Sequence, residues 1–187
     1  IVTVMSVPHE MTIPRRLAGR YLKIELLGIS GSFDFVFDKL TFKAQTSVTN
    51  EAPALASTTD PLVRDIYKVG LNTLKECMQT VYEDGPKRDR RLWIGDLYLE
   101  ALANAYTFKN HELTKHCLYL LAAFANDEGL LHATLLEKPQ PHPQYGTHTL
   151  DYCLIYNVAL LEYLKETGDM ETANDLWPVV VRQIELA

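Results

Sequence analysis

The sequence predicts a mainly α-helical protein that is preceded by the end of an antiparallel β-domain. Two observations carry this prediction. Between residues 20 and 47 apolar residues alternate with polar ones, which is typical of strands, whereas from Asp60 onward they recur at the spacing of helices with one buried face. With 187 residues, of which 47% are apolar, the chain has ample material for one core.

The β-region is predicted from two alternating runs separated by small residues. Gly28, Gly31 and Ser32 lie between the runs, so we expect an antiparallel hairpin that continues toward Ala44. Because an isolated hairpin is only marginally stable, we expect the other strands of its sheet to lie upstream or to be missing from this sequence. The alternating apolar positions are Leu22, Ile24, Leu26, Phe33, Phe35 and Phe37.

The boundary between the β-region and the helices is predicted within residues 48–59, which have the composition of a linker. We therefore divide the chain into residues 1–50 and residues 51–187. The first helix is expected to begin with Asp60 as N-cap and Pro61 at the first helical position, where a missing N–H costs nothing. Its buried stripe should run from Leu62 to Val81, and the helix should end near Glu83.

Four more helices are predicted from the same periodicity. Two are expected over about residues 94–108 and 112–125. A fourth should begin near Leu150 and end with Gly168 as its C-cap, and a fifth should begin at Asp169 and be kinked or restarted at Pro178. Helices joined by alternating short and long loops indicate a toroid of helical hairpins or an α-solenoid, and the lack of a repeat of fixed period favours the toroid.

Residues 126–149 form the longest predicted loop, which is rich in proline and contains three histidines. A loop of this length is unusual in a compact bundle, so it is a candidate wall of a site. His132, His142 and His148 do not have metal-ligand spacing on one helix face, so we predict no metal ligand and no cofactor.

Charge and composition narrow the functional classes. The formal net charge of −6 disfavours a nucleic-acid partner, and no apolar stretch approaches the roughly 20 residues that a membrane span needs. Cys77, Cys117 and Cys153 each lie in an apolar helical pattern, which suits reduced core thiols and favours the cytoplasm. The first residues lack both an initiator Met and a basic signal flank, so we expect the chain to start inside a longer polypeptide.

The densest group of ionisable residues is the segment from Tyr82 to Asp96, called the acidic segment below. Gly85-Pro86 should end the first helix, so that Asp84 faces the open end of the helical assembly. Glycoside hydrolysis needs carboxyl groups on both sides of the sugar, and an aromatic surface such as Trp93 could support the sugar's apolar face. From composition alone, however, a structural network of ion pairs and a core role for Trp93 are the commoner alternatives.

The order and spacing of the acidic segment, Asp84-Gly-Pro-Lys-Arg-Asp-Arg-Arg-Leu-Trp-Ile-Gly-Asp96, resemble the signature of α-L-rhamnosidases of glycoside hydrolase family 78. The helix before it and residues 150–169 resemble the corresponding barrel helices, so the resemblance covers most of the chain. It implies an inverting hydrolase that removes terminal α-L-rhamnose from glycosides. It also implies that residues 51–187 are the first hairpins of an (α/α)6 six-hairpin barrel, after the last strands of an antiparallel β-sandwich domain.

The resemblance also implies roles for individual residues. Asp84 and Asp96 match sugar-binding aspartates, and Asp89 falls where one spacing of the family places the general acid. The family usually has Glu there, so Asp89 is a departure. The supporting contacts would be Arg88 and Trp93, with Asp151, at the start of the fourth helix, as a further substrate-binding candidate.

Two further expectations concern the whole enzyme. The family's general base is a Glu on a much later barrel loop, so we expect the base beyond Ala187 and expect the remainder of the polypeptide as a partner of this chain. Two alternatives remain open: a related six-hairpin hydrolase with another sugar specificity, and a noncatalytic helical interaction module in which the Asp/Arg cluster is structural.

Overall fold

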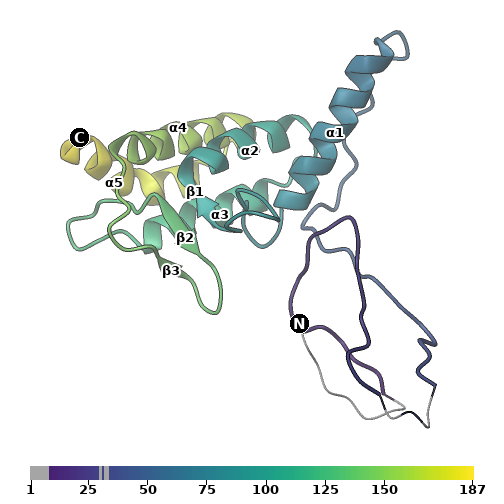
Figure 1. The fold of residues 1–187 in the computed structure, drawn as a ribbon. Helices are drawn as coiled ribbons and strands as arrows, with labels where there is room; N and C mark the ends of the chain where they lie inside the picture. Colours follow the sequence, from purple (N-terminus) through teal and green to yellow (C-terminus); the bar gives the residue numbers. More distant parts are fainter. Residues whose placement is uncertain (1–8, 30, 32–33) are drawn as a thin grey trace. The chain divides into compact units, whose positions relative to one another are not determined.

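The computed structural model describes residues 9–29, 31 and 34–187. The chain forms two compact units, Ile1–Leu40 and Thr41–Ala187. The second unit holds all the described helices and strands, as Figure 1 shows.

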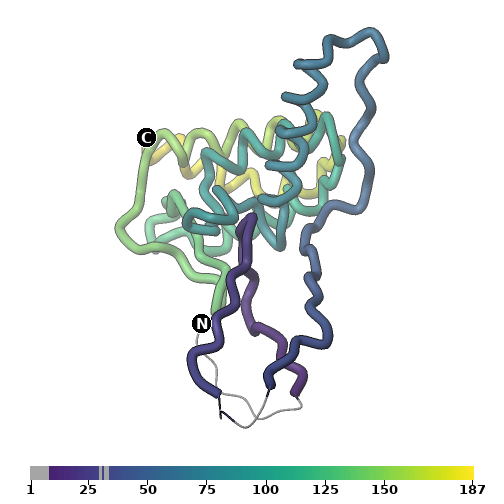
Figure 2. Tube along the Cα trace, turned by 45° about the vertical axis from the view of Figure 1, so that its right-hand side comes forward, coloured from purple at the N-terminus to yellow at the C-terminus, as the bar shows by residue number. Residues whose placement is uncertain are grey.

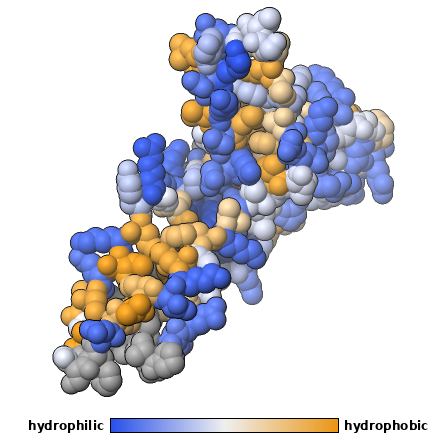
Figure 3. All heavy atoms as spheres, turned by 90° about the vertical axis from the view of Figure 1, so that its right-hand side faces the viewer, coloured by the Kyte–Doolittle hydropathy of each residue, from blue (hydrophilic) through white to orange (hydrophobic). Residues whose placement is uncertain are grey.

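The described residues of the first unit contain neither a strand nor a helix, so the hairpin predicted for residues 20–47 is wrong for this part of the chain. Its turn residue Ser32 and the neighbouring Phe33 lie outside the described residues. Leu22, Ile24 and Leu26 are 45%, 48% and 54% exposed, where the alternation predicted burial, and many apolar residues lie open in this unit (Figure 3). Alternation produces a strand only when a neighbouring strand pairs its backbone and a core covers one face, and the described residues of this unit supply neither.

Helix α1, Pro61–Cys77, begins as predicted, because the Asp60 side chain accepts a hydrogen bond of 2.8 Å from the Leu62 amide. Its predicted buried stripe is confirmed only near the end. Leu62 and Ile66 are 68% and 62% exposed, whereas Leu74 is buried. The first turns of α1 extend away from the other described helices, so no other described helix covers Leu62 and Ile66 (Figure 1). The helix also ends at Cys77, earlier than predicted.

The four later helices confirm their predictions to within about two residues. They are α2, Ile94–Tyr106, α3, His111–Ala123, α4, Leu150–Thr167, and α5, Met170–Leu186. Gly168 ends α4 with a positive φ of 70°, and α5 starts at its predicted cap and continues through Pro178 without restarting. Helix α2 packs chiefly on α4, which also packs on α5, as the trace in Figure 2 shows.

The core of the second unit lies between these helices. Cys77, Cys117 and Cys153 are buried and free, in agreement with the prediction of reduced core thiols. No helix in the described part of the chain is both long and apolar enough to cross a bilayer. The largest fully buried side chains include Tyr82, Tyr156, Met78, Leu92, Ile94, Leu97, Leu118 and Leu121.

A small antiparallel sheet, which the sequence did not predict, joins the acidic segment to the long loop. Strand β1, Leu92–Trp93, pairs with β2, Thr134–Leu136, which pairs with β3, His142–Pro143. Trp93 lies opposite Thr134 in this sheet. The long loop therefore lies directly beside the acidic segment.

Candidate functional site

Asp84 places a buried carboxylate at the start of the acidic segment, and its side chain is 0% exposed. Its Oδ1 accepts a hydrogen bond of 3.0 Å from the Arg91 amide, and its own amide donates to the Arg91 carbonyl at 3.1 Å. Its Oδ2 lies 3.4 Å from Arg88 Nε and accepts no hydrogen bond in the described structure. Asp84 therefore closes the base of the loop that follows it and retains an acceptor position.

The loop between Asp84 and Arg91 is shaped by its own backbone. Arg90 adopts a left-handed φ of 55°, and its Nε donates to the Pro86 carbonyl at 2.6 Å. The Arg91 guanidinium bonds to the Gln144 side chain in the long loop. Asp89 is exposed in this turn, and no hydrogen bond or ion pair joins it to a described residue.

Asp96 lies in the first turn of α2, where a helix N-terminus favours negative charge. Burial and then the charge of Asp84 raise the pKa of Asp96, while a backbone hydrogen bond and Arg88 act in the opposite direction. The structure thus brings the two predicted sugar-binding aspartates within electrostatic reach of each other.

Glu100 is a buried carboxyl that the sequence reasoning missed. Burial, followed by the charge of Asp96, raises its pKa to about 8, although the Cys77 thiol partly opposes this shift. Its Oε2 is buried without a hydrogen-bond partner in the described structure. The sequence could have indicated Glu100 by its spacing, because it follows Asp96 by one helical turn and lies on the same face of α2.

Trp93 lies where the acidic segment enters α2 and packs against α4. Its ring meets that of Tyr152 edge to face, with centroids 6.3 Å apart and an interplanar angle of 88°. The partly buried indole thus has a packing role, as the structural alternative predicted, and its Nε1 is buried without a hydrogen bond. Asp151 is exposed beside Tyr152 in the first turn of α4.

Taken together, the structure brings five of the predicted site residues around the starts of α2 and α4. Besides burial, the charge of Asp84 raises the pKa of Asp96. Besides burial, the charges of Asp96 and Asp151 raise the pKa of the Tyr152 phenol, and Arg88 opposes them. Trp93 touches the same tyrosine. The sixth, Asp89, stands on the exposed turn without a described contact to this group.

Two histidines of the long loop stack beside the small sheet. The rings of His132 and His148 lie 4.3 Å apart, and Tyr145 meets His132 edge to face at 5.8 Å. Burial and the neighbouring His148 lower the pKa of His132. In the described residues no group of three or more His, Cys, Asp or Glu side chains is arranged to hold a metal ion.

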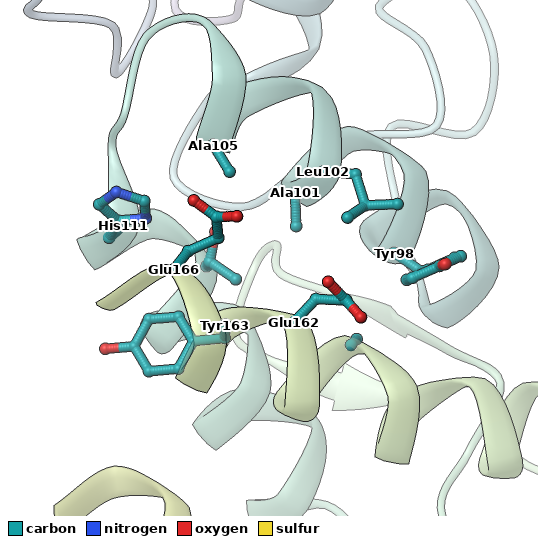
Figure 4. Close-up of a pocket in the computed structure, with 10 residues that line it drawn as sticks. Tyr98, Ala101, Leu102, Ala105, His111, Glu162, Tyr163 and Glu166 are labelled. Carbon is teal, nitrogen blue, oxygen red and sulfur yellow. The ribbon is translucent and has the colours of Figure 1, made fainter. Parts of the chain in front are cut away.

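A hollow between α2, α3 and α4, drawn in Figure 4, contains none of the predicted site residues. Its volume of about 10 Å³ holds roughly one water molecule, so a sugar cannot enter it. The labelled side chains include Glu162 and Glu166 of α4 and His111 at the start of α3. This hollow is therefore not a sugar-binding site.

Comparison with known proteins identifies the family. The sequence profile of the bacterial alpha-L-rhamnosidase 6 hairpin glycosidase domain matches residues 52–186, and that of the glycosyl hydrolase family 78 alpha-rhamnosidase N-terminal domain matches residues 1–44. No curated protein sequence matches the chain.

Two solved structures resemble the chain. A rhamnosidase from Klebsiella oxytoca with rhamnose bound is 46% identical, with a TM-score of 0.72, over 75% of this chain and 27% of that one. A GH78 family rhamnosidase of Bacillus sp. GL1 is 25% identical, with a TM-score of 0.65, over 74% of this chain and 14% of that one. This chain thus spans well under a third of either relative. With its six-hairpin profile match over most of its length, the chain belongs to the bacterial α-L-rhamnosidases of glycoside hydrolase family 78.

Proposed function

We propose that the protein containing this chain hydrolyses terminal α-L-rhamnosides with inversion at the anomeric carbon. The observation that carries the proposal is the buried Asp84 carboxylate, which keeps one oxygen without a hydrogen bond and lies within electrostatic reach of Asp96. Carboxylates that retain acceptor capacity suit the hydroxyl-rich surface of a sugar. The relative from Klebsiella oxytoca, with rhamnose bound, supports the same class of substrate.

In this proposal Asp84 and Asp96 accept hydrogen bonds from sugar hydroxyls. The Arg88 guanidinium forms an ion pair with Asp84, with Nε 3.4 Å from Oδ2. Asp151 adds a further carboxylate at the start of α4. Trp93 forms the aromatic side of the site through its contact with Tyr152.

Asp89 is proposed as the general acid that protonates the leaving oxygen. Its position in the acidic segment and its exposure on the turn support this role, because a proton donor must reach the glycosidic oxygen. Inversion requires a second carboxyl group at roughly 6.5–9.5 Å from the acid, with room for the attacking water. We propose that this base is a Glu beyond Ala187.

For the whole protein we propose that residues 51–187 form the first hairpins of an (α/α)6 barrel. We also propose that residues 1–50, whose described part forms no strand in this chain alone, belong to an antiparallel β-sandwich in which the remainder of the polypeptide supplies the partner strands. The remainder of the polypeptide would complete the barrel and cover apolar helix surface such as Ile66 and Val69 of α1, which are 62% and 65% exposed. Three buried free thiols support a reducing, cytoplasmic location.

The test is release of p-nitrophenol from p-nitrophenyl α-L-rhamnoside, measured for this chain and for the protein encoded by the longest reading frame that contains it. We expect turnover by the longer protein only. Asp89→Asn should lower its kcat by at least about 100-fold, whereas Asp84→Asn, which keeps an oxygen for the Arg91 amide, should chiefly raise KM.

The same assay separates the alternatives. Turnover of another aryl glycoside in place of the rhamnoside would indicate a six-hairpin hydrolase of different specificity. Full activity of both Asp84→Asn and Asp89→Asn would refute the proposed roles. Lack of any sugar binding, together with lower stability of Arg88→Ala and Arg91→Ala, would indicate an interaction module.

A further inference from the structure

Tyr152 lies beside several residues of the candidate site, although the sequence predicted no role for it. It lies in the first turn of α4, between the exposed Asp151 and the buried Cys153. Its side chain is partly exposed, so a ligand at the start of α4 can reach it.

The phenol is held in place by two residues next to Asp96. Trp93 packs its ring edge to face against Tyr152. A Cβ on Gly95 would lie 2.7 Å from Cζ and 2.9 Å from the hydroxyl oxygen of Tyr152, which is closer than Cβ atoms approach other heavy atoms. The tyrosine therefore lies against the α2 backbone, with its hydroxyl beside the residue that precedes Asp96.

The Tyr152 hydroxyl is available to bind a ligand. No hydrogen bond joins the Tyr152 hydroxyl to another described residue. Burial, followed by the charges of Asp96 and Asp151, raises the pKa of Tyr152, so the phenol keeps its proton and can donate. A sugar hydroxyl can donate to a carboxylate and at the same time accept from such a phenol, and the two bonds strengthen each other.

We propose that the Tyr152 hydroxyl is a further sugar-binding group, which donates a hydrogen bond to the same sugar hydroxyl that donates to Asp96. This proposal rests on the proposed function, because it takes the rhamnosyl group as the ligand. Gly95 is part of the arrangement, since only a residue without Cβ lets the phenol approach α2 so closely.

The test uses the protein encoded by the longest reading frame that contains the chain. Hydrolysis of p-nitrophenyl α-L-rhamnoside and calorimetric binding of L-rhamnose are measured for wild type, Tyr152→Phe, Gly95→Ala and the double variant. Tyr106→Phe is the matched control, because this exposed tyrosine lies at the far end of α2.

Tyr152→Phe removes only the hydroxyl, so we expect kcat/KM to fall and the rhamnose Kd to rise by about 10- to 100-fold, as for one hydrogen bond in a charged network. The melting temperature should stay within about 2 °C of wild type, because that hydroxyl makes no bond within the described structure. Gly95→Ala should weaken binding similarly, since the added methyl group displaces the flexible end of Tyr152. The double variant should be no worse than the poorer single variant, because both changes remove the same contact.

Rhamnose binding and kcat/KM within twofold of wild type in Tyr152→Phe would overturn the proposal, as would additive effects of the two substitutions. If the proposed function itself is wrong, the wild-type protein will neither hydrolyse the rhamnoside nor bind rhamnose, which distinguishes that outcome from a failure of the Tyr152 proposal alone. Tyr106→Phe should match wild type in both assays.

Discussion

At the scale of single residues, the acidic segment combines carboxyl groups with very different surroundings. The signature predicted Asp84 and Asp96, and the structure brings them together. Glu100 could have been inferred from its place one helical turn after Asp96 on α2. Tyr152 carries no motif of its own, and it joins the site only because α2 packs on α4 and because Gly95 admits the phenol. Such a contact depends on the relative placement of two helices, which local sequence periodicity does not encode.

Glu100 should make the stability of the protein depend on pH. Its ordinary pKa of 4.5 is raised to about 8 in the folded state, so between these pH values the unfolded chain has lost the proton that the folded chain retains. The free energy of unfolding should therefore fall as pH rises, by up to about 1.4 kcal/mol per pH unit. Glu100→Gln cannot ionise and should remove this slope.

The measurement is the thermal unfolding midpoint of wild type and Glu100→Gln at pH 5 and pH 8. We expect the unfolding midpoint of Glu100→Gln, relative to that of wild type, to be higher at pH 8 than at pH 5. Glu162→Gln is the control, because Glu162 forms a surface ion pair with Lys165 at 2.8 Å and should leave the wild-type slope unchanged. Parallel pH dependence of wild type and Glu100→Gln would contradict the assigned burial.

At the scale of elements, helices were predictable and strands were not. Asp60, Gly168 and Asp169 mark helix ends by local chemistry, and the structure places all three at those ends. In contrast, β1 and β3 have two residues each, which is too short for an alternating pattern. Residues 22–26 have the alternating pattern of a strand, but they form none because no described strand pairs with them.

Asp169 should contribute more to stability than an ordinary surface carboxylate. It caps α5 through the Thr172 amide at 3.0 Å, and it accepts further hydrogen bonds from Tyr163 and Lys115. These bonds hold the pKa of Asp169 well below its usual range. Its stabilising effect is therefore present above about pH 4 and is lost as pH falls below that value.

Asp169→Ala should lower the thermal unfolding midpoint by several degrees at pH 7 and by clearly less at pH 3, as differential scanning calorimetry would show. Asp65→Ala is the matched control, since Asp65 forms an exposed ion pair with Lys68 at 3.6 Å and should change the midpoint little at either pH. An equal loss at both pH values would show that the ionised carboxylate is not what stabilises α5.

At the scale of the whole molecule, the structure and the sequence place the division of the chain differently. The sequence predicts a boundary after residue 50, within a linker, whereas the compact units meet between Leu40 and Thr41. Residues 45–50 explain the difference because they bond to the helical unit. The Ser47 amide donates to the Met78 carbonyl at 2.8 Å, and the Asn50 side chain donates to the Phe108 carbonyl at 3.0 Å.

These hydrogen bonds predict how far the helical unit can be truncated from its N-terminal side without losing stability. Thr46 also donates from its hydroxyl to the Lys75 carbonyl at 2.8 Å, so two carbonyls at the end of α1 depend on this segment. A protein that starts at Glu51 loses these bonds, each worth about 1 kcal/mol, whereas one that starts at Thr41 keeps them. Thermal unfolding of the two truncated proteins, both extended to the same C-terminus, should therefore give a midpoint several degrees lower for the shorter one. Equal midpoints would instead support the boundary after residue 50 and would show that residues 41–50 serve only as a linker.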